Sequence, residues 1–250
     1  MRLRVIDQGI DSAIASHAVP YGIADAMTAE AEPVLTLCTA EPHVSVGANQ
    51  DLAREVDEDR CRALGLPVLR REVGGGVVLI DRNQLYFHFV FPRRLAPERA
   101  ERLFQRFAAP VLATYADLGI AATHAAQEIQ VGGRKLGAAA ATEIGAAVVV
   151  AGSFLFDFDR DAFAQSLRIS GDETRETIRR ALDDRMVTLR ELLPEHPDRD
   201  RIKDSFLAHI GRISGHNITE SVPTSSEESA VAAVAARHAG EAWIRHRRRL

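Results

Sequence analysis

The sequence predicts an α+β fold in which a mixed, mostly antiparallel sheet is flanked by helices. Residues 68–92, VLRREVGGGVVLIDRNQLYFHFVFP, indicate strand, glycine turn, strand and strand, because apolar and β-branched runs precede an alternating one. Residues 97–118 place apolar side chains at three- and four-residue spacing, which is typical of a helix that packs on a sheet. Residues 135–156 contain two apolar runs joined at Ile144-Gly145 and indicate an antiparallel hairpin.

The other elements follow from apolar patterns and breaker residues. In the first part of the chain we expect a strand over 1–8, a helix over 12–28 that breaks near Pro20, strands over 34–38 and 43–46, and a helix over 57–64 that ends at Gly65. Later we expect short apolar segments at 120–123 and 129–131, a turn at Gly132-Gly133, and helices over 161–167, 174–182 and 198–210.

A composition change near residue 218 predicts the domain organisation. We expect a main domain over 1–217, a linker over 218–229 (ITESVPTSSEES), and a C-terminal helix with a basic tail over 230–250. Ser225 and Glu228 have the spacing of a capping box ahead of an Ala-rich helix that runs to Trp243. The ending RHRRRL is interpreted as a solvated terminus.

Composition limits the classes of function. A hydrophobic content of 46% and a charged content of 26% are ordinary for a globular protein. The formal charge of −4 argues against general binding to nucleic acid, and no apolar run approaches a membrane span. We therefore expect neither nucleic acid nor membrane as a partner. Cys38 and Cys61 lack metal or disulfide spacing, which favours a reducing cytoplasm and structural thiols.

Histidine spacing does not suggest a metal site. The nine histidines show no HxxxH, HExxH or Cys/His pattern, so no metal-ligand set is predicted. His88, between Phe87 and Phe89, is interpreted as part of the polar face of an alternating strand.

The triple glycine of residues 74–76 is the first candidate site. Glycines allow main-chain N–H groups to approach an anion because no Cβ intervenes, and Arg70 and Arg71 add positive charge with planar geometry. A phosphate or carboxylate site is the functional interpretation, and a tight turn is the alternative. The motif is neither a Walker loop nor a GxGxxG loop that opens a helix.

Lys135 is the second candidate. It follows the Gly132-Gly133 turn and precedes LGAAAA, a strand whose small side chains leave room for a ligand. A lysine at a dry site stabilises negative charge that develops on a phosphate or carboxylate. The alternative is an exposed strand lysine after a hairpin turn.

These two blocks carry a resemblance to a known family. RREVGGGVVLID resembles the RRxxGGGxxxHD block of the lipoate-protein ligases, which are relatives of the biotin ligases, and GGRKLGAAA resembles their GxKxxGxAx lysine block. The resemblance spans roughly residues 30–215. It implies the fold shared by lipoate ligases, biotin ligases and class II aminoacyl-tRNA synthetase cores. It also implies activation of lipoate or octanoate by MgATP to acyl-AMP, and then acyl transfer to a lysine of a lipoyl carrier protein.

The resemblance also implies roles for individual residues. Lys135 would be the catalytic residue that bridges the acyl carboxylate and the α-phosphate. The residues expected to bind ATP or the acid, besides Lys135, are Arg70, Arg71, Gly74, Gly75, Gly76, Val77, Asp81, Gln127 and Gly137. The sequence departs from the family pattern at three places: Ile80 replaces a His, Gln127-Glu128 replaces Asn-Asp, and Gly-Ser-Phe at 152–154 replaces His-Gly-Thr.

Two other functions are weighed. A cysteine-dependent octanoyl or lipoyl transferase on the same scaffold needs a thiol near the lysine block or the later hairpin, and ATHAAQEIQVGG and VVVAGSFLFDFD contain none. A catalytically degenerate homologue would bind lipoate or nucleotide without releasing pyrophosphate. Only about twenty residues follow the expected linker, so a separate accessory chain is an expected partner if the reaction needs one.

Overall fold

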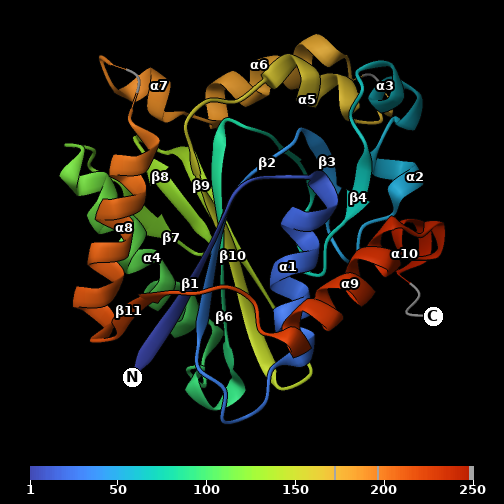
Figure 1. The fold of residues 1–250 in the computed structure, drawn as a ribbon. Helices are drawn as coiled ribbons and strands as arrows, with labels where there is room; N and C mark the ends of the chain where they lie inside the picture. The colour runs from blue at the N-terminus through green and yellow to red at the C-terminus, as the bar shows by residue number, and fades with distance from the viewer. Residues whose placement is uncertain (172, 196, 248–250) are drawn as a thin grey trace.

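The computed structural model describes residues 1–171, 173–195 and 197–247, so positions 248–250 of the predicted basic tail lie outside it. The predicted α+β fold is confirmed. An eight-stranded sheet has the order β11-β1-β2-β6-β10-β9-β8-β7 (Figure 1). Strand β1 pairs in parallel with β2 and β11, and the other neighbours in this sheet are antiparallel. Its strands are β1 (Arg2–Asp11), β2 (Val34–Ala40), β6 (Gln84–Pro92), β7 (Thr123–Ala125), β8 (Glu128–Val131), β9 (Arg134–Ile144), β10 (Ala147–Leu155) and β11 (Asn217–Glu220).

A second, three-stranded sheet has the order β4-β3-β5. Its strands are β3 (His43–Val46), β4 (Val68–Arg70) and β5 (Val77–Ile80). The strand, glycine turn, strand, strand prediction for 68–92 is therefore confirmed, but the last strand belongs to the large sheet. The turn between β4 and β5 lines a cavity together with residues of β9 and β10 from the large sheet.

Helices cover both faces of the large sheet. The helices of the described residues are α1 (Ala13–Ala26), α2 (Leu52–Glu55), α3 (Glu58–Ala63), α4 (Ala100–Asp117), α5 (Arg160–Ser166), α6 (Arg175–Arg185), α7 (Leu189–Leu192), α8 (Arg199–Ser214), α9 (Ser225–Ala239) and α10 (Glu241–His246), with a 3₁₀ turn at Arg93–Leu95. In Figure 1, α4 and α8 lie on one side of the sheet, and α1 and α9 lie on the other. The predicted helix over 97–118 and the predicted hairpin over 135–156 correspond to α4 and to β9–β10.

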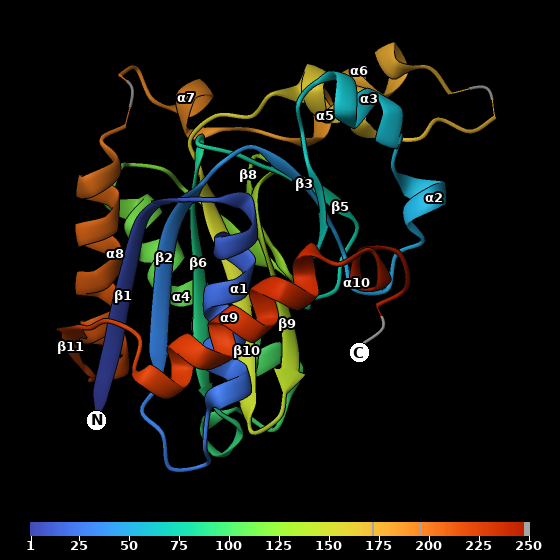
Figure 2. The same cartoon turned by 45° about the vertical axis from the view of Figure 1, so that its right-hand side comes forward.

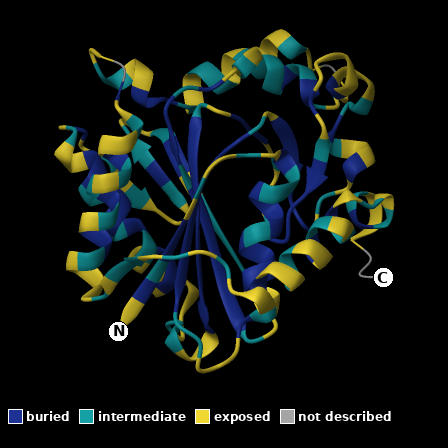
Figure 3. Ribbon diagram, in the orientation of Figure 1, coloured by how far each residue is buried: buried dark blue, intermediate teal, exposed yellow. Residues whose placement is uncertain are grey.

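Alternation along β6 places its side chains in two separate cores. Phe87, Phe89 and Phe91 belong to the core under α4 and α8, whereas Tyr86 and Val90 belong to the core under α1. Both faces of this central strand are covered, as the dark blue strands of Figure 3 show.

His88 does not lie on a polar face. It is 1% exposed and packs against Tyr21 and Tyr86, and its Nδ1 lies 3.5 Å from Thr36 Oγ1. Burial lowers the pKa of His88 to about 3. The prediction of a polar face was wrong because α1 covers the side of β6 that the local pattern left open to solvent.

Helix α1 continues through Pro20, where a break was predicted. Proline removes one backbone donor, but tertiary packing holds the helix, because α9 crosses α1 in close contact (Figure 2). A Cβ at Gly22 would lie 2.5 Å from the backbone of Val231 in α9. The two helices therefore pack backbone to backbone at this point.

The segment predicted as a linker contains regular structure. Strand β11 pairs in parallel with residues 2–5 of β1, and α9 begins at Ser225, so only residues 221–224 connect them. The capping box is formed by Thr224 and Glu227, one residue before the predicted pair Ser225 and Glu228. The predicted single helix to Trp243 is divided at Gly240 into α9 and α10.

Candidate active site

A cavity of about 990 Å³ lies between the β9–β10 hairpin and the glycine turn. One wall consists of small residues: Gly137, Ala138, Ala139 and Ala140 of β9, and Ala151, Gly152 and Ser153 of β10. Small side chains leave space above the sheet that larger residues would fill. A Cβ on Gly137 would lie 3.4 Å from the Ser153 carbonyl oxygen, which is an ordinary van der Waals contact.

The glycine loop, residues 74–76, forms the facing wall with Val77. Gly75 has a φ of +92°, a conformation that favours glycine. A Cβ on the neighbouring Gly47 would lie 1.8 Å from the Gly75 carbonyl oxygen, so the loop lies directly on the backbone of residue 47.

Arg71 holds this loop from behind. Its guanidinium donates to the carbonyl oxygens of Gly74 (2.8 Å), Gly76 (2.8 Å) and Ser45 (2.7 Å). Because these bonds draw the carbonyls toward Arg71, they fix the peptide planes of the loop. Arg71 lines the cavity as predicted, and its donors organise the loop.

Arg70 and Asp81 do not line the cavity, unlike the other predicted residues. Arg70 is 2% exposed, and its Nη1 donates to the carbonyls of Gly47, Ala48 and Gln50. Asp81 accepts from the backbone and side chain of Asn83. Arg70 cannot contact a phosphate in the cavity because adjacent strand residues point to opposite sides. Both residues therefore support the loops around the cavity.

Lys135 lies at the start of β9 and lines the cavity together with Gln127 and Glu128. Its Nζ is 3.4 Å from Glu128 Oε1, and its side chain is 38% exposed. The Lys135 carbonyl accepts from Val187 N at 2.9 Å, which anchors the backbone of the lysine to the segment after α6. The structure thus brings the glycine loop and the lysine block, about sixty residues apart in sequence, to one cavity.

Part of the cavity wall was missed by sequence reasoning. Leu182, Arg185 and Met186 at the end of α6, with Phe158 and Phe163 near α5, also line the cavity, and Met186 forms a β-bridge with Lys135 of β9. Arg185 adds a second exposed cation. No local motif marks these residues, because only the packing of α5 and α6 over the cavity brings them there.

Residues from all three departures from the family pattern line the cavity: Ile80, Gln127, Glu128, Gly152 and Ser153. Ile80 is 2% exposed and lines the cavity with an apolar side chain. Gly152 is required by packing, since a Cβ there would lie 2.6 Å from Phe87. Ser153 donates to Gln84 Oε1 at 3.2 Å.

No cysteine is among the described residues that line the cavity. Cys38 and Cys61 are buried free thiols. Burial raises the pKa of Cys38 to about 12 and that of Cys61 to about 11, which disfavours the nucleophilic thiolate. Both observations agree with the structural role expected for the two thiols.

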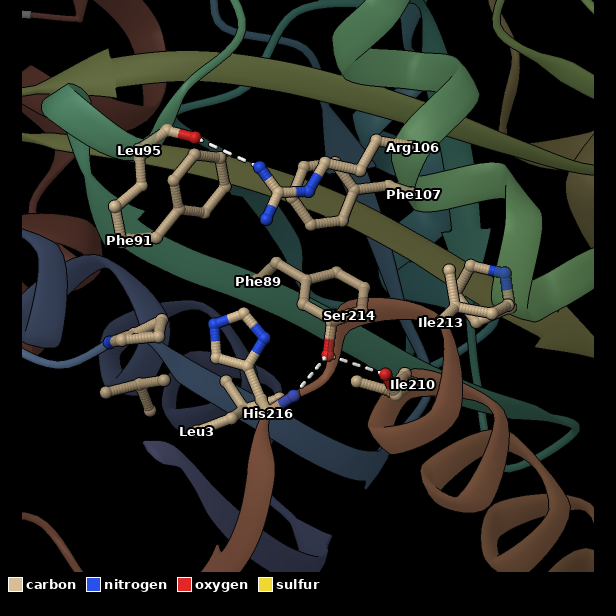
Figure 4. Close-up of a pocket in the computed structure, with 13 residues that line it drawn as sticks. Leu3, Phe89, Phe91, Leu95, Arg106, Phe107, Ile210, Ile213, Ser214 and His216 are labelled. Atoms are coloured by element: carbon tan, nitrogen blue, oxygen red, sulfur yellow. Dashed lines mark hydrogen bonds between the residues drawn. The ribbon is translucent and has the colours of Figure 1, made fainter. Parts of the chain in front are cut away.

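A second cavity of about 200 Å³ lies on the α4 and α8 side of the sheet (Figure 4). It is formed mainly by apolar side chains, including Phe89, Phe91 and Phe107. Arg106 donates to the Leu95 carbonyl and Ser214 donates to the Ile210 carbonyl, whereas Nδ1 of His216 has no hydrogen-bond partner among the described residues, and the cavity lacks the glycine loop and Lys135. The larger cavity is therefore the candidate active site.

Two features of the described residues concern metal binding and membrane insertion. No three His, Cys, Asp or Glu side chains among them converge as a metal-ligand set. None of their helices combines the length and apolar character needed to cross a bilayer.

The fold and the sequence define the class of protein. Residues 17–211 match the lipoyl protein ligase A/B catalytic domain family, and the chain belongs to this family. Among curated relatives, the octanoyltransferase LipM of Symbiobacterium thermophilum is 27% identical over 81% of this chain and 82% of the relative. The lipoate-protein ligase LplJ of Bacillus subtilis is 24% identical over 72% of this chain and 56% of the relative.

Solved structures share the fold. The bi-partite lipoate protein ligase of Thermoplasma acidophilum, described with its E2 lipoyl domain, superposes with a TM-score of 0.91 at 20% identity, covering 100% of this chain and 98% of that one. A lipoate-protein ligase A bound with ATP gives a TM-score of 0.85 at 19% identity, covering 98% of both chains. The resemblance found in the glycine and lysine blocks is thereby confirmed at the level of family and fold.

Proposed function

We propose that this protein is an ATP-dependent lipoate-protein ligase, which activates lipoate or octanoate as acyl-AMP and transfers the acyl group to a lysine of a lipoyl carrier protein. One observation carries the proposal. The cavity unites a lysine and a glycine loop, and no cysteine lies among its described lining residues. Activation by ATP needs cations and N–H donors, whereas acyl transfer through a thioester needs a thiol.

In the first step, a carboxylate oxygen of the acid attacks the α-phosphorus of ATP. The bond from that phosphorus to the bridging oxygen breaks, and pyrophosphate leaves with the electron pair. Negative charge increases on the phosphoryl oxygens during this step. Lys135 is the proposed cation at that position, and the glycine loop, held by Arg71, supplies backbone N–H donors to the phosphates.

In the second step, the neutral amine of the carrier lysine attacks the acyl carbonyl carbon. The bond to the AMP oxygen breaks, AMP leaves, and the amine proton passes to solvent or to the departing phosphate. The small residues of β9 and β10 accommodate the aliphatic chain, and Phe158, Phe163 and Leu182 add apolar surface to the same cavity. Mg²⁺ enters as part of the MgATP substrate.

The proposed partners are a lipoyl carrier protein and a separate accessory chain. The similarity to a Thermoplasma acidophilum ligase described as bi-partite supports the second partner. Adding a candidate accessory chain should then raise the rate of carrier modification. A full rate with this chain alone, unchanged by the addition, would remove the need for it. The free cysteines fit the cytoplasm as the compartment of the reaction.

Octanoyl transfer from a carrier thioester is the second candidate, because relatives named octanoyltransferase LipM match most of the chain. The two functions differ in acyl donor. Purified protein is incubated with a lipoyl domain and either octanoate plus MgATP, or octanoyl-acyl carrier protein without ATP, and carrier mass is measured together with pyrophosphate. We expect octanoylation in the first mixture, with one pyrophosphate for each carrier. Modification only in the second mixture would identify a transferase, and modification in neither would favour a degenerate homologue.

A further inference from the structure

Helix α10 binds strand β4 through a reciprocal pair of hydrogen bonds. Trp243 Nε1 donates to the Arg70 carbonyl oxygen at 2.9 Å, and Arg70 Nε donates to the Ile244 carbonyl oxygen at 2.7 Å. Trp243 is 1% exposed, so the first bond is shielded from water. Helix α10 is therefore attached to the strand that leads into the glycine loop (Figure 1).

Helix α9 contacts Glu72, two residues after Arg70. Arg237 Nη2 donates to Glu72 Oε1 at 2.7 Å, and the Glu72 side chain is 1% exposed. The His238 ring stacks on Trp243 with 4.9 Å between ring centroids and 12° between planes. Arg237 also lies over the Trp243 ring at 5.3 Å from its centroid. These contacts join α9, α10 and residues 70–72 into one buried unit.

Residues 70–72 also hold the loops that border the cavity. Arg70 donates to three carbonyls of residues 47–50, and Arg71 donates to the carbonyls of Gly74 and Gly76. The amides of Gly47 and Ala48 in turn donate to the carbonyls of Gly76 (3.2 Å) and Val73 (3.0 Å). Residues 70–72 thus connect the C-terminal helices to the glycine loop. Trp243 itself does not line the cavity.

We propose that the α9–α10 pair sets the geometry of the glycine loop, and that Trp243 is a positioning residue that acts through Arg70. Nucleotide binding and docking of the C-terminal helices are then coupled, so each strengthens the other. The proposal rests on the proposed function only for the identity of the ligand. Docking of the loop onto residues 47 and 48 can be measured without any ligand.

The key variant is Trp243→Phe, which keeps an aromatic ring on His238 and removes the N–H donor. The matched control is Val234→Ala, which removes buried methyl groups from the core that α9 shares with α1 and leaves the hydrogen bonds and ion pairs to residues 70–72 in place. Hydrogen exchange at the amides of Gly47 and Ala48 reports docking of the loop, because their acceptors lie in residues 73–76.

Trp243→Phe should accelerate exchange at both amides by about five- to tenfold, the effect of one net hydrogen bond. MgATP should bind about tenfold more weakly, with kcat at saturating MgATP within about twofold of wild type. Val234→Ala should lower the thermal midpoint while exchange and affinity stay at wild-type values. Wild-type exchange in Trp243→Phe, or equal acceleration in Val234→Ala, would overturn the proposal.

Two further measurements keep the test independent of folding and of the ligand. If Trp243→Phe does not fold, Arg237→Gln is used instead, because it breaks the contact with Glu72. It should also accelerate hydrogen exchange at the amides of Gly47 and Ala48. Trp243 is the only tryptophan of the chain, so its emission should change when MgATP binds at the loop, with the same midpoint as calorimetry. Unchanged emission while calorimetry shows binding would contradict the coupling. Absence of binding by calorimetry would count against the ligase function and leave the exchange test intact.

Discussion

Lys135 Nζ lies 3.4 Å from Glu128 Oε1 at the edge of the candidate active site. The lysine side chain is 38% exposed and the glutamate side chain 40%. An ion pair this exposed contributes little, typically below about 1 kcal/mol. The lysine can therefore leave Glu128 for an anionic ligand at small cost, as expected of a group whose main partner is a substrate.

The first prediction separates the role of Lys135 in chemistry from a role in the fold. Lys135→Ala should slow acyl-adenylate formation by at least about a hundredfold, because it removes charge-assisted hydrogen bonds worth about 1.5–3 kcal/mol each. The thermal midpoint should hardly change. Lys203 is the only other lysine and pairs with Asp7 at 2.9 Å, away from the cavity, so Lys203→Ala is the matched control. Near-normal adenylate formation in Lys135→Ala would remove this residue from the mechanism.

The second prediction concerns the glycine loop. Gly75→Val should weaken nucleotide binding by more than about tenfold, because Gly75 has a φ of +92° and an added Cβ would lie 3.0 Å from Arg71 Nη2. Gly119→Val, at φ +75° beyond α4, introduces similar backbone strain at a residue that does not line the cavity. It should lower stability and leave nucleotide affinity unchanged. If folded Gly75→Val binds nucleotide as tightly as wild type, the loop is only a turn.

The third prediction tests the cysteines. Replacing both Cys38 and Cys61 by Ala should leave ATP-dependent carrier modification within about threefold of wild type, because neither thiol lines the cavity and burial raises both pKa values. Loss of buried sulfur should lower the thermal midpoint. Intact-protein mass spectrometry after incubation with octanoyl thioester gives a second readout. A stable acyl adduct that disappears with either substitution would support the transferase instead.

The fourth prediction is a loss of stability in acid. His43 is fully buried beside His17, and burial lowers its pKa to about 4. In the unfolded chain the histidine pKa is near 6.5, so as the pH falls the unfolded state binds a proton at His43 before the folded state does. The contribution to stability is therefore full above about pH 6.5 and decreases toward pH 4. Wild type should lose about 2 kcal/mol more than His43→Gln between pH 7 and pH 5. Urea denaturation at both pH values measures this difference, and parallel losses in the two proteins would contradict it.

Local sequence patterns predict the elements and both halves of the cavity. The glycine loop and Lys135 are recognisable because their chemistry depends on residue type at short spacing. Arg70 and Arg71 show the limit of that approach, since neighbouring residues on a strand face opposite sides. Arg71 holds the glycine loop, whereas Arg70 is directed to the residue 47–50 loop and to α10.

Tertiary packing determines the features that the sequence did not predict. Residues 218–220 were predicted as part of a polar linker, but they pair in parallel with β1, more than two hundred residues away. Arg185 and Met186 reach the cavity only because α6 lies over it. The attachment of Trp243 to Arg70 likewise joins segments far apart in the chain. Such contacts leave no periodic signal in a single sequence.

The most direct test of the ligase proposal is isotope exchange between pyrophosphate and ATP that depends on octanoate or lipoate, with no carrier protein present. This measurement isolates adenylate formation and needs neither a lipoyl domain nor an accessory chain. If the protein is a ligase, the wild-type chain should catalyse exchange only when octanoate or lipoate is present. Lys135→Ala should reduce this exchange by at least about a hundredfold. Absence of exchange in a folded wild-type protein that octanoylates a lipoyl domain from octanoyl-acyl carrier protein would contradict the ligase proposal.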